Sequence, residues 1–518
     1  MRPRLPGPEA ENHAQNRGVD MREEFERVSP ESVGVSSGAI LEYLDALEAS
    51  GTQMHGLMLM RHGKLLAEGW WAPYGPRLRH GLQSHSKTYA ATAVGILYTE
   101  GKVRLDERII DIFPECAPEN PSENLRLLTV RDVLCMGCGM ETEPRPATEH
   151  WIRDFLHTPV VHRPGTAYMY NSTGSSLLCA IVKRKTGEGV EEYLTKRLYE
   201  PCGMDPQVHR WYPMPDGVEG GGFGMMSTLE DNLRLLKLYA DGGVCNGRRI
   251  LAEDYVRLAT SNQNDSATEA INNPEATDNH LGYGFQIWMC KPKGVYRADG
   301  AMGQFTIVCP EQDMIVAITE TAEGAHWAQS TLDITWEFLA KVTGDRVLPE
   351  GPETAQLARR MRTLCTPQLP CRPRHGVPAA ALTASYRVTE GYLTPHFHNP
   401  MLTKPEGLDG FTFAEDDYGL IWKVRYASGR TEAIRLATYG SWHTQVLGTP
   451  EDYVRVCAAA AWWQDATTLA VELKWVETCF TKRLWFAFRT EGLAVTEEKL
   501  GSFAARIPDQ TIRVEREA

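Results

Sequence analysis

Apolar positions near the start of the chain first follow a helical period and then form two short continuous runs. Residues 40–47 carry apolar side chains three and four apart, Ser36 before them suits a helix cap, and Gly51 suits a helix end. The apolar runs 57–60 and 65–71 come next, separated by a short polar segment. This pattern predicts an amphipathic helix followed by a β-hairpin.

Helical and strand patterns then follow one another in blocks. A helix is expected over 84–100, with Gly101 ending it, and a stretch of helices and loops follows over 103–260. Strand patterns return at 283–288, 304–309 and 314–319, and a helix is expected over 326–342. Strands at both ends with helices between them predict an α+β domain, in which one antiparallel sheet is built from both ends and flanked by helices.

The pattern changes again beyond a proline-rich stretch that includes a short Arg-rich helix. There, strand patterns dominate, at 411–413, 420–426, 432–437, 469–476 and 484–488. We therefore expect four parts: a disordered leader over 1–20, an α+β domain over 21–346, a proline-rich linker over 347–378, and an all-β barrel or sandwich over 379–518.

Composition narrows the class of protein. Of 518 residues, 42% are hydrophobic and 23% charged, which is ordinary globular usage. The 54 Lys and Arg against 67 Asp and Glu leave a formal charge of −13, so no nucleic-acid partner is expected. The apolar run 456–463 is far shorter than the about 20 residues that span a bilayer, so no membrane partner is expected either.

The number and spacing of the cysteines and the N-terminal residues both indicate the cellular compartment. The 12 cysteines are spread through a long chain, which is unlike the disulfide framework of a small secreted domain. The polar start of the chain lacks the apolar core of a secretory signal. A cytoplasmic location with reduced thiols is therefore expected.

The strongest chemical signal is Ser84-His85-Ser86-Lys87 at the start of the helix expected over 84–100. Residues three apart share a helix face, so the Ser84 hydroxyl and the Lys87 amine can meet. Burial lowers the pKa of a lysine, and a neutral amine can activate a serine as a nucleophile. This spacing alone also arises by chance, so its context decides the interpretation.

Two further segments supply that context. Tyr170-Asn171-Ser172 precedes an apolar helix and can present a phenol, an amide and a hydroxyl, although an aromatic core residue with a helix cap would have the same sequence. The segment 297–304 contains small residues that enter a strand, where substrate could approach the backbone and an N–H could bind an oxyanion.

In this order and spacing, the three segments resemble the Ser-x-x-Lys, Tyr-x-Asn and Lys/His-Thr-Gly motifs of the serine β-lactamase and penicillin-binding-protein superfamily. The resemblance covers about 30–345 and points to the class C-like branch, which includes esterases, D-aminopeptidases and 6-aminohexanoate-dimer hydrolase. It implies that Ser84 is the acylated nucleophile, with Lys87 and Tyr170 as general base and acid. It also implies an oxyanion hole of the Ser84 and Ala301 backbone N–H groups, with no metal or other cofactor.

Two departures from the family pattern concern the substrate. The Asn expected after Tyr-x is Ser172 here, and Asn171 stands one place early. The Lys or His of the third motif is Ala298, followed by Asp299 and Gly300. We expect Ser172, Asn171, Asp299 and Gly300 to line the substrate site. The missing cation and the added carboxylate predict weak β-lactamase activity and a preference for neutral or cationic esters and amides.

Other clusters carry weaker signals. Cys135 and Cys138 have a metal-like spacing without a second ligand pair, so no zinc site is expected. The glycine run 220–222 lacks the Lys-Ser/Thr of a phosphate loop. Four tryptophans of the C-terminal part are more typical of a β-domain core than of a ligand cage: Trp462, Trp463, Trp475 and Trp485.

Three functions remain open at this stage. The first is a serine hydrolase that cleaves an ester or amide of a small molecule through a Ser84 acyl-enzyme. The second is an acyltransferase, which shares the acylation step and passes the acyl group to an alcohol or amine. The third is a non-catalytic sensor or binding protein with a degenerate site, which the intact Ser84, Lys87 and Tyr170 disfavour.

Overall fold

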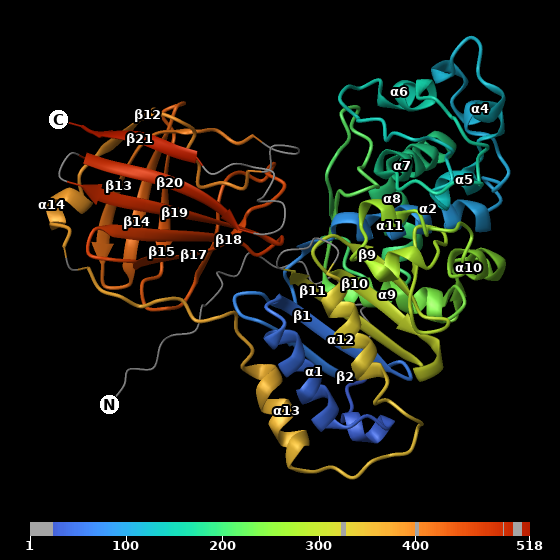
Figure 1. The fold of residues 1–518 in the computed structure, drawn as a ribbon, viewed down its shortest axis with the longest axis horizontal. Coiled ribbons are helices and arrows are strands. Elements are labelled where there is room, and N and C mark those ends of the chain that lie inside the picture. The colour runs from blue at the N-terminus through green and yellow to red at the C-terminus, as the bar shows by residue number, and fades with distance from the viewer. Residues whose placement is uncertain are drawn as a thin grey trace.

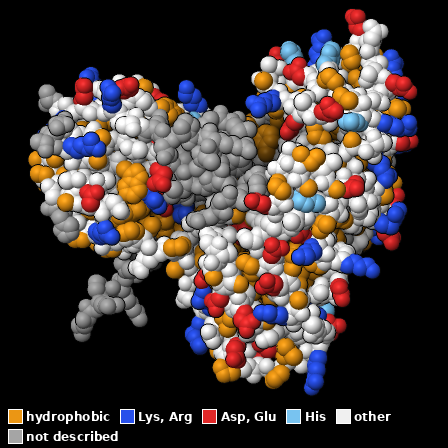
Figure 2. All heavy atoms as spheres, in the orientation of Figure 1, with side chains coloured by type: hydrophobic (Ala, Val, Ile, Leu, Met, Phe, Trp, Pro, Cys, Tyr) orange, Lys and Arg blue, Asp and Glu red, His pale blue; other side chains and the backbone are white. Residues whose placement is uncertain are grey.

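The computed structural model describes residues 24–322, 328–374, 376–398, 404–489, 492–500 and 510–517. Figure 1 shows a body of helices and sheet beside a β-barrel formed by the C-terminal part of the chain. The leader predicted over 1–20 lies outside the described residues. In Figure 2, acidic and basic side chains are interspersed over the visible face.

A six-stranded antiparallel sheet forms the centre of the body, in the order β2-β1-β11-β10-β9-β8. Its strands are β1 (Gln53–Arg61), β2 (Lys64–Trp70), β8 (Trp288–Met289), β9 (Tyr296–Gly300), β10 (Gln304–Cys309) and β11 (Met314–Thr321). The first strand pairs with the last, with Leu57 opposite Ile318. The predicted assembly of one sheet from both ends of the segment is therefore confirmed.

The first two predicted elements have the expected local signals. Helix α1 (Ser37–Ala49) begins at the Ser36 cap, whose hydroxyl accepts from the Gly38 N–H at 3.1 Å. The β1–β2 hairpin turns through His62 and Gly63, which both adopt positive φ, of 52° and 71°. Such paired positive φ values match the twist of a two-residue hairpin turn.

Helices cover both faces of the sheet, so its strands are buried on both sides. Leu57 and Leu59 of β1 pack in one core with α1, α12 (Gln329–Leu339) and α13 (Pro352–Arg362). Met58 and Met60 point the other way, into a core with α2 (Ser86–Thr99) and α9 (Leu229–Ala240). Alternating side chains on a strand explain why one continuous apolar run serves two cores.

A mainly helical subdomain lies over the second face (Figure 1). Its remaining helices are α3 (Ile109–Ile112), α4 (Glu123–Leu127), α5 (Val130–Leu134), α6 (Trp151–His157), α7 (Ser172–Thr186), α8 (Val190–Leu194), α10 (Glu253–Ala259) and α11 (Glu269–Asn272). Five short strands accompany them: β3 (His80–Gly81), β4 (Arg210–Trp211), β5 (Met225–Ser227), β6 (Val244–Cys245) and β7 (Arg248–Arg249). Among the described residues, no helix combines the length and apolarity needed to cross a bilayer.

The prediction of a strand over 283–288 is wrong for most of that segment. Tyr283 makes two isolated bridges, Gln286 turns the chain with φ of 56°, and only Trp288 enters β8. Gln286 is fully buried, and its amide donates to the Leu134 carbonyl at 2.8 Å. Hydrogen bonds between this side chain and a distant segment therefore favour a turn here, although the sequence pattern favours a strand.

The C-terminal part is a nearly closed antiparallel barrel of ten strands. The strands are β12 (Tyr386–Glu390), β13 (Leu408–Asp416), β14 (Gly419–Tyr426), β15 (Thr431–Leu436), β16 (His443–Val446), β17 (Val456–Trp463), β18 (Thr468–Trp475), β19 (Phe480–Arg489), β20 (Gly492–Leu500) and β21 (Gln510–Arg516). The order runs β15-β14-β13-β12-β21-β20-β19-β18-β17-β16. A bridge between Ala437 and Ala460 brings its ends together, so the prediction of a β-domain here is confirmed.

Candidate active site

Ser84 lies in a short 3₁₀ turn (Gln83–His85) that leads directly into α2. Ser86 holds this turn, because its hydroxyl donates to the Gln83 carbonyl at 2.6 Å and accepts from the Met225 N–H at 2.9 Å. Gln83 has a positive φ of 52°, which is uncommon for a residue with a side chain. A strained turn held by neighbouring contacts is a common setting for a reactive group.

Lys87 lies one helical turn further on and is 1% exposed. Its Nζ donates to Ser84 Oγ at 3.0 Å, to Ser172 Oγ at 3.1 Å and to the Gly222 carbonyl at 2.5 Å. All three acceptors are neutral. Burial therefore lowers the pKa of Lys87 to about 7, although the negative charges of Glu143 and Asp299 act to raise it.

Tyr170 covers the same amine. Lys87 Nζ is 4.6 Å from the centre of the tyrosine ring, which stacks on Trp288 with centroids 5.8 Å apart. Burial raises the pKa of the phenol, and a hydrogen bond with Ser84 opposes the shift. The phenol is consequently a proton donor rather than a phenolate at neutral pH.

Asn171 and Ser172 have different roles at the start of α7. Asn171 is fully buried, and its Oδ1 accepts from the Gly174 N–H at 2.7 Å. It therefore caps α7, although it was expected beside the substrate. Ser172 is the residue whose hydroxyl reaches Lys87. The side chain at the family's Asn position thus faces the site, and its neighbour holds the helix.

The glycine run 220–222 contributes to the site in a way that the sequence pattern did not reveal. A Cβ on Gly222 would lie 2.2 Å from the Ser172 carbonyl oxygen, and one on Gly221 would lie 2.6 Å from Cys179 Sγ. Only glycine fits this close contact with α7. This close approach brings the Gly222 carbonyl to Lys87. The three consecutive glycines are the feature of the sequence that could have indicated it.

The third segment places Asp299 near Lys87 but does not leave it unpaired. Arg297 donates through Nε to Asp299 Oδ2 at 2.8 Å, and it also donates to Asn279 Oδ1. Arg297 is fully buried, whereas the Asp299 side chain keeps 12% of its surface exposed. Burial raises the pKa of Asp299, and the guanidinium opposes this shift. The carboxylate is close enough to Lys87 to act on its pKa, and Arg297 partly offsets its charge.

Gly300 lets strand β9 approach the Ser84 turn. A Cβ at this position would be 2.0 Å from the Leu82 carbonyl oxygen. The next residue, Ala301, therefore sits beside the turn that carries Ser84. Neither the Ser84 N–H nor the Ala301 N–H donates to a backbone carbonyl within the described part of the chain. Both groups can donate to a ligand.

The barrel contacts the elements that carry this site. The Gly81 N–H donates to the Glu477 carbonyl at 2.7 Å, and Thr321 Oγ1 donates to the Cys479 carbonyl at 3.1 Å. Tyr453 Oη donates to the Gly224 carbonyl at 3.0 Å, two residues beyond Gly222. The sequence pattern carried no sign of these contacts.

The cysteine pair singled out by its spacing forms no metal centre among the described residues. Cys135 and Cys138 are both buried, and burial raises the pKa of Cys135 to about 12. No group of three potential ligands gathers anywhere in the described ranges. The two thiols are core residues instead.

Comparison with known proteins places the chain in a family. The 6-aminohexanoate-dimer hydrolase of Paenarthrobacter ureafaciens is 26% identical over 299 residues, which are 52% of this chain and 74% of that protein. Penicillin-binding protein 4 of Amycolatopsis lactamdurans is 24% identical over 305 residues, covering 52% and 77%. The octameric penicillin-binding protein homologue of Pyrococcus abyssi is 14% identical with a TM-score of 0.47, covering 92% and 99%. The sequence profile described as Beta-lactamase matches residues 44–331, more than half of the chain, and the chain therefore belongs to the β-lactamase family.

Proposed function

We propose that the chain is a serine hydrolase that cleaves a small-molecule ester or amide through an acyl-enzyme on Ser84. The contact between Lys87 Nζ and Ser84 Oγ at 3.0 Å, in a site where the lysine is buried, carries this proposal. A pKa of about 7 leaves much of the lysine neutral at neutral pH, so it can act as a base. The named relatives are consistent with hydrolytic chemistry in this family.

The proposed acylation step uses the groups around Lys87. The neutral amine takes the proton of the Ser84 hydroxyl while Oγ bonds to the substrate carbonyl carbon. The carbonyl oxygen gains the electron pair and accepts from the Ser84 and Ala301 N–H groups. Collapse of this intermediate breaks the bond to the leaving group, which takes a proton from Tyr170, and Lys87 returns a proton to the phenolate.

Deacylation repeats the sequence with water. Lys87 removes a proton from the water, the new oxygen bonds to the acyl carbon, and the bond to Ser84 Oγ breaks as that oxygen takes the proton back from Lys87. An alcohol or amine in place of water would make the same protein an acyltransferase. Both outcomes share the acyl-enzyme, so the acyl-enzyme is the species to test.

For the substrate, we propose a neutral or cationic ester or amide. Ala298 replaces the cation that would hold a carboxylate, and Asp299, which acts on the pKa of Lys87, keeps 12% of its side chain exposed. Ser172 supplies a hydroxyl beside Lys87 where the family pattern has an amide. An anionic substrate would lose a charge-assisted hydrogen bond and approach a carboxylate.

The test is intact-protein mass spectrometry after exposure to a fluorophosphonate. Wild type should gain one adduct on Ser84, and Ser84→Ala should gain none while its circular dichroism spectrum is unchanged. Ser428→Ala, in an exposed turn of the barrel, is the matched control and should label like wild type. An adduct that survives Ser84→Ala, or no adduct on folded wild type, would favour a non-catalytic protein or another nucleophile.

A further inference from the structure

The four tryptophans of the barrel divide into two pairs with different surroundings. Trp463 and Trp475 lie in the barrel core, as their sequence pattern predicted. Trp462 and Trp485, the outward pair, point instead to the outer side of the barrel wall, where Trp462 is still buried at 3% exposed and Trp485 is half-buried. Side chains alternate between the faces of a strand, so adjacent Trp462 and Trp463 point in opposite directions.

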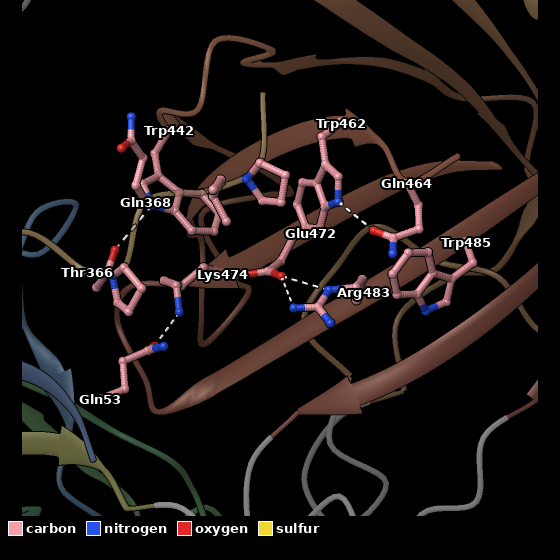
Figure 3. A pocket seen from close by; sticks show the side chains of 13 residues that line it. Gln53, Thr366, Gln368, Trp442, Trp462, Gln464, Glu472, Lys474, Arg483 and Trp485 are labelled. Atoms are coloured by element: carbon pink, nitrogen blue, oxygen red, sulfur yellow. Dashed lines mark hydrogen bonds and ion pairs between the residues drawn. The ribbon is translucent and has the colours of Figure 1, made fainter. Parts of the chain in front are cut away.

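The outward pair lines a cavity of about 400 Å³ between the barrel and the linker. Figure 3 shows Trp462, Trp485 and Trp442 around it, with Glu472, Lys474 and Arg483 from neighbouring strands. Gln53, the first residue of β1, reaches in from the other side, and Thr366 begins the linker segment that forms one wall.

Strand register explains why this face is hollow. Ala470 of β18 lies between Trp462 on one neighbouring strand and Trp485 on the other. Ala460 lies beside Glu472 in the next row. Small side chains between large indoles leave a depression whose rim is aromatic and whose floor is polar.

Charged groups in this cavity balance one another. Arg483 donates to Glu472 Oε2 through Nε at 2.9 Å and through Nη2 at 2.7 Å. Its guanidinium lies 5.5 Å from the ring centres of both Trp462 and Trp485. Glu498 accepts from the Trp485 indole N–H at 3.1 Å and forms a second ion pair with Arg483 at 3.5 Å, while the charge of Glu472 also acts on a second cation, Lys474. Two cations and two carboxylates leave little net charge.

Several polar atoms here retain hydrogen-bonding capacity. Both contacts of Arg483 use Glu472 Oε2, so Oε1 has no partner among the described residues. Lys474 donates to Gln53 Oε1 and to Thr481 Oγ1, which accounts for two of its three donors. Gln464 accepts from the Trp462 indole through its carbonyl oxygen, and its NH₂ group remains available.

From this arrangement, we propose that the cavity is a binding site for an uncharged hexopyranoside. A pyranose ring has apolar C–H faces that stack on indoles, while its hydroxyls both donate and accept around its edge. The cavity offers aromatic surface together with an acceptor on Glu472 and donors on Lys474 and Gln464. A charged ligand gains little here, because the two cations and two carboxylates already balance one another.

The experiment uses the full chain, with Ser84 first blocked by a fluorophosphonate so that binding in the hydrolase site is removed. Saturation-transfer NMR and titration calorimetry are run with methyl β-D-glucopyranoside, methyl β-D-galactopyranoside and N-acetyl-D-glucosamine. The expected result is binding of at least one of them that persists in the blocked protein. Trp485→Ala should then raise its Kd about tenfold or more, because a stacking face is lost.

Two variants make the result decisive. Trp336→Ala, which removes a half-buried tryptophan on α12, should leave the Kd unchanged. Glu472→Gln keeps the shape of the cavity, removes one charge and should weaken binding of the same sugar. The proposal is overturned if no sugar binds at millimolar concentration, if blocking Ser84 abolishes binding, or if Trp485→Ala leaves it unchanged. Selective binding of tetramethylammonium instead would also overturn it.

Discussion

The Gly81 N–H donates to the Glu477 carbonyl at 2.7 Å, which joins the segment just before Ser84 to the β18–β19 turn of the barrel. The Glu477 side chain secures that turn. Its Oε1 accepts from Arg79 Nε at 2.6 Å, and its Oε2 accepts from the backbone N–H groups of Arg455 and Val456 at 2.5 and 2.7 Å. The Glu477 backbone carbonyl therefore ties the barrel to the segment before Ser84, and the buried Glu477 carboxylate adds a bond to Arg79 in the same segment.

We expect Glu477→Gln to lower the acylation rate about tenfold, because the Ser84 turn loses its support and small displacements of a reacting group are costly. The free energy of unfolding should also fall, by about 3 kcal/mol, since Arg79 loses its buried partner. Acylation is measured with a p-nitrophenyl ester at a temperature where the variant is fully folded. Glu390→Gln, which breaks an exposed barrel ion pair with Arg513, is the control and should match wild type.

The lowered pKa of Lys87 predicts a pH dependence. The amine must be neutral to accept the Ser84 proton, so kcat/KM should rise with pH through about 7 and level off above it. Lys87→Arg should be inactive at every pH, because a guanidinium does not lose its proton. A flat profile across this range in wild type would contradict the assignment of the base.

The same pKa affects stability. The unfolded lysine has its ordinary pKa of 10.5, so between pH 7 and 10.5 the unfolded chain holds a proton that the folded chain lacks. The free energy of unfolding should therefore rise with pH over this window. Lys87→Met should remove this part of the rise, as measured by urea unfolding at several pH values.

Lys87 and Tyr170 should behave as one unit. Tyr170→Phe and Lys87→Ala are each expected to lower kcat by about 10² or more, the usual cost of a lost acid or base. The double variant should lose far less than the product of the two, because residues that act together are not additive. Single-turnover kinetics measure this, and normal turnover in Tyr170→Phe would contradict the pairing.

Gly300→Ala tests whether β9 must approach the Ser84 turn. The new Cβ would lie 2.0 Å from the Leu82 carbonyl oxygen, so the strand must move away and carry Ala301 with it. We expect kcat to fall by about 10², as when one oxyanion donor is lost. Gly75→Ala is the matched control because no atom lies within 4 Å of its Cβ, and it should have wild-type kinetics.

Asp299→Asn tests the expected substrate preference while keeping the side chain's shape beside Arg297. Wild type should turn over nitrocefin poorly and a neutral short-chain p-nitrophenyl ester well. The variant should raise kcat/KM for nitrocefin about tenfold relative to the ester, because a carboxylate no longer faces the anionic substrate. Efficient nitrocefin turnover by wild type, unchanged in Asp299→Asn, would show that Asp299 does not set the preference.

The sequence by itself determined the elements whose signals are local. Helical spacing placed Lys87 one turn from Ser84, and the Ser36 cap marked the start of α1. Blocks of strand pattern on either side of a helical stretch were enough to predict one sheet built from both ends. These signals depend on the 2.0 and 3.6 residue periods of single elements, which a sequence displays directly.

Only the tertiary structure decided which distant groups meet. It selected Ser172 rather than Asn171 to face Lys87, brought the Gly222 carbonyl to the same amine, and buried Arg297 against Asp299. It also separated Trp462 from Trp463 and tied Glu477 to the Ser84 turn. These contacts join elements far apart in the chain, and their geometry depends on packing and register, which no periodicity within one segment encodes.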